Sequence, residues 1–537
     1  MHRIRKIDAQ MAESVDALVS NTSGATHPGS TPGLGTKQGR KSKDLRPCSF
    51  FITMKNRNSR TNNKLRYKLN KIGIDMKKTL LLAALSAMSL GAVAQSITPQ
   101  MLEKFKSENT MTATDRAIHN AMAANDVRNL AVNQANQTEM DTYFTHSVPS
   151  KGITDQRSSG RCWLFTGLNV MRSKVINEHN LPELTFSHVY NFFYDQLEKS
   201  NLFLQAVIDT GDKPMEDKTV EWLFQHPLSD GGTFTGVADL VAKYGIVPAG
   251  VMPETYASNN TSRFTSLIKR KLREDGLILR DKVAAGAKKK ELEALKADML
   301  SEVYRILVLG FGEPVTTFKW APKDAKGKYM WEPKEYTPQS FYAEFVGEDY
   351  QNDYIMLMND PTREYWKTYE IQYDRHTYDG HNWLYLNLPL DDIKQMAIAS
   401  IKDSTMMYFS CDVNKEIDSK RGLLDLDNYD YESILGIKFG MDKAQRIRVF
   451  DSGSSHAMTM MAVNLDAEGK PTMWKVENSW GAASGHKGHL IMTDEWFNEY
   501  MFRLVVNKKY ATPEVLKAAK QKPILLPCWD PMFLGEE

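Results

Sequence analysis

The sequence predicts an α+β fold, with helices in the first half of the chain and strands in the second. Residues 162–175 place apolar side chains at helical spacing, and residues 263–312 form a long, charged segment of helical composition. The apolar and β-branched runs at 406–413 and 457–465 are typical of buried strands. Because the helical segments come first and the β-rich segments last, the order of elements favours an α+β arrangement.

The first 94 residues differ in character from the rest of the chain. From Met76, a pair of lysines, an apolar run over 80–93 and small residues before Gln95 are typical of a secretory signal peptide over residues 76–94. We therefore expect an exported protein, periplasmic or extracellular, with a cytoplasmic protein as the alternative. Since a signal peptide acts only at an N-terminus, residues 1–75 are predicted to be either a non-native extension from a start assigned too early or a disordered extension.

Charge and composition restrict the class of function for residues 95–537. The full chain of 537 residues is 42% apolar and 25% charged, which is ordinary for a globular protein, and its formal net charge is +2. Residues 95–537 alone hold 51 Lys and Arg against 61 Asp and Glu, a net charge of −10. This acidic balance disfavours binding to nucleic acid or to an anionic membrane. No stretch after about residue 100 has the length and apolar composition of a transmembrane helix.

Local signals place further elements along the chain. Residues 96–146 are expected to be helical, and residues 230–232, Asp-Gly-Gly, to form a turn before a helix that stops at Gly245. The long helical segment should break near Gly286. Residues 318–390 are rich in Tyr, Trp, Pro and Asp, which predicts loops with short strands.

A candidate nucleophile opens the first strongly predicted helix. Cys162 follows Ser-Ser-Gly at 158–160, and a helix N-terminus lowers the pKa of a thiol and so favours the thiolate. Gln156, six residues upstream, offers a side-chain N–H for the oxyanion that forms when a carbonyl is attacked. A lone cysteine here would more simply be a buried apolar residue. The combination of Gln156, Gly-x-Cys and Trp163 favours catalysis instead.

A candidate base and its orienting partner lie near the C-terminal end. His456 begins an apolar run, and Asn478 begins the motif Asn-Ser-Trp-Gly 22 positions later. The intervening residues 466–471 have turn composition, so a hairpin centred near Gly469 would bring His456 and Asn478 together. The Asn478 carbonyl can then accept a hydrogen bond from one imidazole nitrogen and leave the other facing Cys162. Trp480 is expected to shield that bond from water.

The remaining cysteines and histidines do not suggest a disulfide framework or a metal site. Without the leader, the chain has three cysteines, Cys162, Cys411 and Cys528, an odd and sparse set. His486 and His489 lie among glycines and lack further ligands at suitable spacing, so we interpret them as parts of a turn. We expect neither a metal nor another cofactor.

With these motifs in place, the chain resembles the papain superfamily of cysteine peptidases and, more closely, the bleomycin hydrolase and bacterial aminopeptidase C family. The resemblance covers roughly residues 100–537. It rests on the run Gln-Arg-Ser-Ser-Gly-Arg-Cys-Trp at 156–163, on His456 and Asn-Ser-Trp-Gly at 478–481, and on several motifs absent from ordinary papains. These are Asp-Gly-Gly at 230–232, Lys-Tyr-Gly at 243–245, Leu-Arg at 272–273, Glu-Val-Tyr-Arg at 302–305, Cys-Asp-Val at 411–413, Met-Thr-Asp-Glu-Trp at 492–496 and Trp-Asp-Pro-Met at 529–532.

The resemblance implies a two-lobed fold, with the nucleophile in a helical lobe and the base in a β-rich lobe. It also implies a helical and loop-rich insertion at about 255–390, which includes a hook through which six subunits assemble. In the family, the C-terminal tail, here residues 529–537, runs into the active-site cleft. The terminal carboxylate of Glu537 would then pair with the free ammonium of a substrate. The tail departs from the family pattern after Met532.

Three functions follow, in order of preference. The first is an aminopeptidase that removes N-terminal residues from peptides through a thioester at Cys162. The second is a broad endopeptidase with the same chemistry. The third is a nucleic-acid-binding protein, since some members of the family bind nucleic acid, and the acidic charge of residues 95–537 disfavours it.

Overall fold

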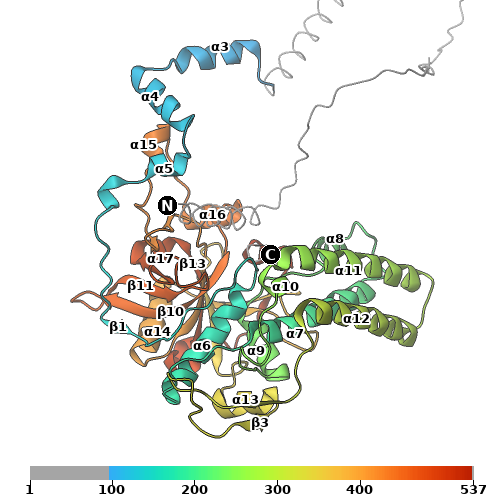
Figure 1. The fold of residues 1–537 in the computed structure, drawn as a ribbon. Coiled ribbons are helices and arrows are strands. Elements are labelled where there is room, and N and C mark those ends of the chain that lie inside the picture. The colour runs from blue at the N-terminus through green and yellow to red at the C-terminus, as the bar shows by residue number, and fades with distance from the viewer. Residues whose placement is uncertain (1–95, 535–537) are drawn as a thin grey trace, which may run out of the picture. The chain divides into compact units, whose positions relative to one another are not determined.

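The computed structural model describes residues 96–534 (Figure 1). The predicted signal peptide at 76–94, the preceding residues 1–75 and the predicted anchoring residue Glu537 lie outside the described residues. Among the helices described, none has the length and apolar composition to cross a membrane. The three cysteines within this part of the chain form no disulfide.

The prediction of helices over residues 96–146 is wrong for residues 132–146, which are mainly loop, and is confirmed for residues 96–131. Their helices are α3 (Pro99–Glu108), α4 (Ala113–Met122) and α5 (Val127–Ala131). The side chain of Thr98 accepts a hydrogen bond from the backbone N–H of Met101 at the start of α3. Thr112 and Asp115 form a reciprocal capping box at the start of α4. Local capping therefore sets where both helices begin.

The helical part that follows is built around α6, which is buried on almost all sides. The periodicity predicted one apolar face, but Asn169, Arg172 and Ser173 of α6 are buried too, because helices cover one side of α6 and the sheet covers the other. Glycines with positive φ end α9 at Gly245 (72°) and separate α11 from α12 at Gly286 (77°), as predicted.

The helices of residues 131–534 are α6 (Cys162–Glu178), α7 (His188–Asp209), α8 (Lys218–Gln225), α9 (Phe234–Tyr244), α10 (Tyr256–Asn259), α11 (Thr261–Ala284), α12 (Lys289–Phe311), α13 (Pro338–Phe345), α14 (Leu390–Lys402), α15 (Tyr431–Leu435), α16 (Lys443–Arg448), α17 (Asp494–Tyr500), α18 (Pro513–Ala518) and α19 (Pro531–Leu534), with short 3₁₀ turns η1 (Gln134–Asn136) and η2 (Lys508–Tyr510). Helices α11 and α12 form a long pair beside α7. Figure 1 shows this pair extending from the helical part.

A 12-stranded sheet forms the β-rich part. The order along it is β14-β5-β6-β4-β13-β7-β10-β11-β12-β9-β8, with β1 also paired to β10. The strands are β1 (His146–Ser147), β4 (Tyr354–Met358), β5 (Lys367–Ile371), β6 (Leu384–Asn387), β7 (Met407–Cys411), β8 (Ile417–Asp418), β9 (Leu423–Leu424), β10 (His456–Leu465), β11 (Pro471–Glu477), β12 (His489–Thr493), β13 (Met501–Asn507) and β14 (Ile524–Leu526); β2 (Phe318–Trp320) and β3 (Lys334–Tyr336) form a separate pair.

Strands β10 and β11 form the predicted hairpin, with Gly469 at positive φ (80°) in its turn. Two hydrophobic cores support the two parts. One is dominated by α6, α7, α9, α11 and α12. The other lies on the sheet, against α14 and α17. The predicted α+β class is confirmed.

Candidate active site

Cys162 is the first residue of α6 and is half-buried. Burial raises the pKa of its thiol, while the backbone N–H groups of Ala457, Trp163 and Cys162 itself act in the opposite direction. Ala457 follows His456 in the chain, so the thiol lies beside the start of β10. The N-terminus of the 17-residue helix adds a favourable field for a thiolate.

His456 and Asn478 meet across the hairpin. His456 is the first residue of β10 and is 6% exposed. Its Nε2 lies 2.8 Å from Oδ1 of Asn478, which follows directly after β11. Because a carbonyl oxygen can only accept, Nε2 carries the proton and donates, and Nδ1 is left as the basic nitrogen. Burial, partly opposed by the Asn478 bond, lowers the pKa of His456 to about 4, so the imidazole is neutral at neutral pH.

Trp480 covers this pair. Its ring centroid lies 4.8 Å from that of His456, with the planes tilted by 31°. Asn478 is 2% exposed, and its Oδ1 also accepts the backbone N–H of Ser479 at 2.8 Å. The His456–Asn478 hydrogen bond is therefore sheltered from competing water, which keeps the imidazole in one tautomer and orientation.

Gln156 is held in place by two hydrogen bonds. Its Oε1 accepts from the Ser479 hydroxyl at 2.6 Å, and its Nε2 donates to the carbonyl of Ser159 at 2.7 Å. Its side-chain amide has two N–H groups, so one donor remains for a ligand. Gln156 is only 3% exposed, so its amide cannot swing freely. The arrangement can supply a fixed donor to an oxyanion near Cys162.

The loop that carries Gln156 is joined to the Asn478 segment like an extra strand. The backbone N–H of Gln156 donates to the Ser479 carbonyl at 2.8 Å, and the N–H of Gly481 donates to the Thr154 carbonyl at 3.1 Å. Asp155 and Trp480 form a β-bridge between these two bonds. The donor and the orienting asparagine therefore belong to one backbone unit.

A buried ion pair that sequence reasoning missed joins the nucleophile helix to the hairpin. Arg172, on α6, pairs with Glu477, the last residue of β11, and the Ser150 hydroxyl donates to the same carboxylate. The two charged side chains are 2% and 0% exposed. Removing one partner of a salt bridge this deeply buried strongly destabilises the folded state, so the pair holds β11 against α6.

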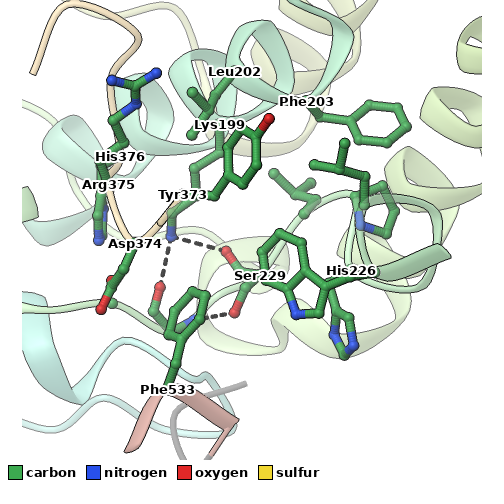
Figure 2. A pocket seen from close by; sticks show the side chains of 16 residues that line it. Lys199, Leu202, Phe203, His226, Ser229, Tyr373, Asp374, Arg375, His376 and Phe533 are labelled. Carbon is green, nitrogen blue, oxygen red and sulfur yellow. Dashed lines mark hydrogen bonds between the residues drawn. The ribbon is translucent and has the colours of Figure 1, made fainter. Parts of the chain in front are cut away.

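A cavity of about 80 Å³ lies between α7, α8 and the loop at 373–376 (Figure 2). Gly231 and Gly232 line it, as does Phe533 from the C-terminal segment. The Phe533 ring lies 5.6 Å from that of Trp222, and Met532 is fully buried. The C-terminal segment is thus docked as far as Phe533.

The predicted site residues thus fall into two groups. The structure brings Gln156, His456, Asn478 and Trp480 into one hydrogen-bonded and stacked cluster beside Cys162, whereas Glu537 lies outside the described residues. Arg172 was missed, since a basic residue on a helix is usually solvated and nothing nearby in the sequence indicates otherwise.

The two histidines at 486 and 489 lie in a turn, with the His486 N–H donating to the His489 carbonyl at 2.9 Å. Residues 96–534 contain no group of three or more His, Cys, Asp or Glu side chains that could hold a metal ion.

Comparison with known proteins gives consistent results. The model of the Peptidase C1-like family matches residues 96–533. Bleomycin hydrolase of Homo sapiens is 40% identical over 423 residues, which cover 77% of this chain and 93% of that protein. Aminopeptidase C of Streptococcus thermophilus is 35% identical over 439 residues, 81% of this chain and 98% of that protein. The solved structure of PepW from Lactobacillus rhamnosis HN001 matches with a TM-score of 0.79 and 35% identity, over 82% of this chain and 99% of that one.

Proposed function

The chain belongs to the peptidase C1-like family and is a cysteine aminopeptidase, and we propose that it removes N-terminal residues from peptides through a thioester at Cys162. The observation that carries this assignment of roles is the 2.8 Å hydrogen bond between His456 and Asn478. It fixes the protonated nitrogen of His456 and leaves Nδ1 as the base for a thiol on the adjoining helix end.

Acylation begins with transfer of the Cys162 proton to Nδ1 of His456. The thiolate sulfur bonds to the carbonyl carbon of the scissile peptide, and the carbonyl oxygen becomes an oxyanion. The free Nε2–H of Gln156 and the backbone N–H of Cys162 stabilise that charge. When the tetrahedral intermediate collapses, the C–N bond breaks and the imidazolium gives its proton to the departing amine. The N-terminal residue remains as a thioester.

Deacylation uses the same groups in reverse. His456 Nδ1 takes a proton from water, and the hydroxide oxygen bonds to the thioester carbon. The C–S bond then breaks, and the proton returns from the imidazolium to the sulfur of Cys162. Asn478 keeps the imidazole oriented in both half-reactions, since its hydrogen bond lies on the nitrogen that does not transfer protons.

Specificity for a free N-terminus is assigned to the C-terminal tail. The Met532 carbonyl accepts from the guanidinium of Arg503, and Phe533 reaches the cavity beside Gly232, so the segment approaches the site. A tail on this side would leave room for a short N-terminal piece of substrate. The carboxylate of Glu537 would pair with the substrate's ammonium.

Peptide substrates with free and blocked N-termini test this function. The wild-type enzyme should hydrolyse aminoacyl amides and spare their N-acetylated counterparts. Deleting residues 533–537 should lower the first activity and raise cleavage of blocked peptides, whereas deleting Glu536 and Glu537 alone separates the role of the carboxylate from that of Phe533. A truncated enzyme with an unchanged preference would favour the broad endopeptidase.

Export and assembly complete the proposal. The family resemblance implies a homohexamer built through the insertion, and sedimentation velocity of the purified protein measures the subunit number. The sequence of residues 76–94 supports export with Gln95 as the mature N-terminus. N-terminal sequencing of native material decides between this and the cytoplasmic alternative, because recovery of peptides from residues 1–75 would exclude cleavage.

A further inference from the structure

Lys199, on α7, donates to two carbonyls of the backbone segment 229–232 and to one carboxylate on its own helix. Its Nζ donates to the carbonyl of Ser229 at 3.1 Å and to the carbonyl of Gly231 at 2.6 Å (Figure 2). It also lies 3.0 Å from Oδ2 of Asp195, one turn earlier on the same helix. An ammonium has three N–H donors, so none is left for a ligand in the cavity. Lys199 therefore acts on the segment and not on a bound molecule.

Asp195 locks the lysine in this position. The carboxylate is fully buried, and it accepts hydrogen bonds from His376 Nδ1 at 2.5 Å and from Gln196 Nε2 at 3.1 Å. Burial opposes ionisation of Asp195, but Lys199 and His376 outweigh it and lower the pKa, so the group is a carboxylate. Gln196 also donates to the Ser229 carbonyl at 3.0 Å. These hydrogen bonds join Asp195, Gln196, Lys199 and His376 into one buried network, in which only the Gln196 Oε1 lacks a partner among the described residues. Buried hydrogen bonds of this kind restrict the movement of the groups that they join.

The segment is also packed tightly against the nucleophile helix. Trp163 donates its indole N–H to the Asp230 carbonyl at 2.8 Å. A Cβ on Gly232 would lie 2.1 Å from the ring of His376 and 2.9 Å from that of Trp163. A Cβ on Gly160, in the turn before the helix, would lie 2.8 Å from Asp230. Only glycine fits at Gly160 and Gly232, which brings the segment directly beside the nucleophile.

Gly232 differs from its neighbours in this segment because both its backbone N–H and its carbonyl are unpaired among the described residues. The carbonyls at 229 and 231 accept from Lys199, and the carbonyl at 230 accepts from Trp163. The N–H of Thr233 donates to Nε2 of His376 at 3.4 Å. Within residues 96–534, neither the N–H nor the carbonyl of Gly232 has a hydrogen-bond partner. An extended peptide can pair with such a free backbone edge.

We propose that Lys199 is a positioning residue for substrate: by holding the carbonyls of Ser229 and Gly231, it orients Gly232 to pair with the short N-terminal piece of the bound peptide. The proposal rests on the proposed function for the site, but it concerns how the substrate backbone is held. It predicts an effect on the affinity of backbone-containing ligands and none on the intrinsic reactivity of Cys162.

The test compares two irreversible reagents on the wild type and on Lys199→Met. Iodoacetamide reports thiol reactivity without needing Gly232, whereas an aminoacyl chloromethyl ketone must also bind through its backbone. In Lys199→Met we expect the half-saturating concentration of the ketone, and KM for an aminoacyl amide, to rise roughly tenfold, which corresponds to losing one or two ordinary hydrogen bonds. The iodoacetamide rate and kcat should stay within about threefold, and Lys199→Arg should restore most of the affinity.

Lys174→Met is the matched control, since Lys174 also donates to a backbone carbonyl, that of Val346 at 2.8 Å, and pairs with a carboxylate, that of Glu348 at 2.9 Å. It should leave all four quantities unchanged. An unchanged half-saturating concentration in folded Lys199→Met overturns the proposal, as does an equal loss with iodoacetamide. If Lys199→Met does not fold, Lys199→Gln takes its place with the same criteria. A wild type that reacts with both reagents but hydrolyses no aminoacyl amide would contradict the proposed function alone.

Discussion

Replacing Gln156 by alanine should slow catalysis by about 10²–10³-fold in kcat, with little change in KM. The Gln156 side chain is 3% exposed; its oxygen accepts from Ser479 and one N–H donates to Ser159, so one N–H remains for the oxyanion. Loss of one preorganised oxyanion donor costs about 2.7–4 kcal/mol of transition-state stabilisation. The charge it serves exists only after the carbonyl is attacked, so the loss falls on kcat and not on ground-state binding.

The assay is steady-state hydrolysis of an aminoacyl fluorogenic amide, with active enzyme counted by iodoacetamide titration of Cys162. Ser479→Ala is an informative second variant, because it removes the 2.6 Å bond that orients Gln156 and keeps the donor itself. We expect a loss below about tenfold there, in line with one ordinary hydrogen bond. Gln205→Ala, which removes a half-buried glutamine that bonds Asp209 and Lys296, is the control for substitution as such.

Two results would refute this reasoning. A folded Gln156→Ala enzyme with wild-type kcat would show that the second N–H does not meet the oxyanion. A raised KM with unchanged kcat would make Gln156 a binding residue, since an interaction present equally in the ground and transition states alters only KM.

The other predictions concern the remaining parts of the site. Cys162→Ala should abolish turnover and leave the thermal midpoint near the wild-type value, and alkylation of the wild type should label Cys162 first; retained activity after labelling elsewhere would contradict the assignment. Asn478→Ala should lower kcat more than it raises KM, measured on the same substrate, because only the orientation of His456 is lost. Stability to urea should fall as the pH drops from 6.5 towards 4, because the pKa of His456 is about 4 in the folded state and the unfolded chain therefore binds the proton first. A wild-type stability that does not change with pH, or an equal pH dependence in His456→Gln, would show that His456 is not responsible. Arg172→Met should reduce the free energy of unfolding by about 3–5 kcal/mol in a urea titration, because Glu477 is left buried without its partner, and a loss below about 1 kcal/mol would show that the pair is dispensable.

Local patterns in the sequence were enough to predict that Cys162 begins a helix and that His456 and Asn478 meet. Cys162 lies at the start of a helix, which periodicity and the preceding Ser-Ser-Gly turn indicate. His456 and Asn478 are 22 residues apart on a hairpin whose turn composition near Gly469 sets the register, and a register error of one residue would have put them on opposite faces. Short sequence separation made the contact between His456 and Asn478 predictable, whereas the approach of Cys162 to the start of β10 was expected from the family resemblance.

The supporting contacts could not be predicted in the same way. Arg172 and Glu477 are 305 residues apart, and nothing local distinguishes a buried arginine on a helix from a solvated one. Lys199 posed the same difficulty, since two of its acceptors are backbone carbonyls, which every residue has and which the sequence therefore cannot distinguish. Charged residues are normally outside, and the exceptions are set by tertiary contacts.

Helix α6 supplies anchoring side chains for the site in addition to Cys162. Two turns after Cys162, the Asn169 side chain donates to the Thr154 hydroxyl at 3.0 Å, in the loop that leads to Gln156. One turn further, Arg172 holds Glu477, the residue before Asn478. The oxyanion donor and the orienting asparagine are thus both tied, through buried polar side chains, to the helix that presents the thiol. Precise positioning of three chain segments requires such common anchoring, and this is why α6 buries Asn169 and Arg172 among side chains that are otherwise mostly apolar.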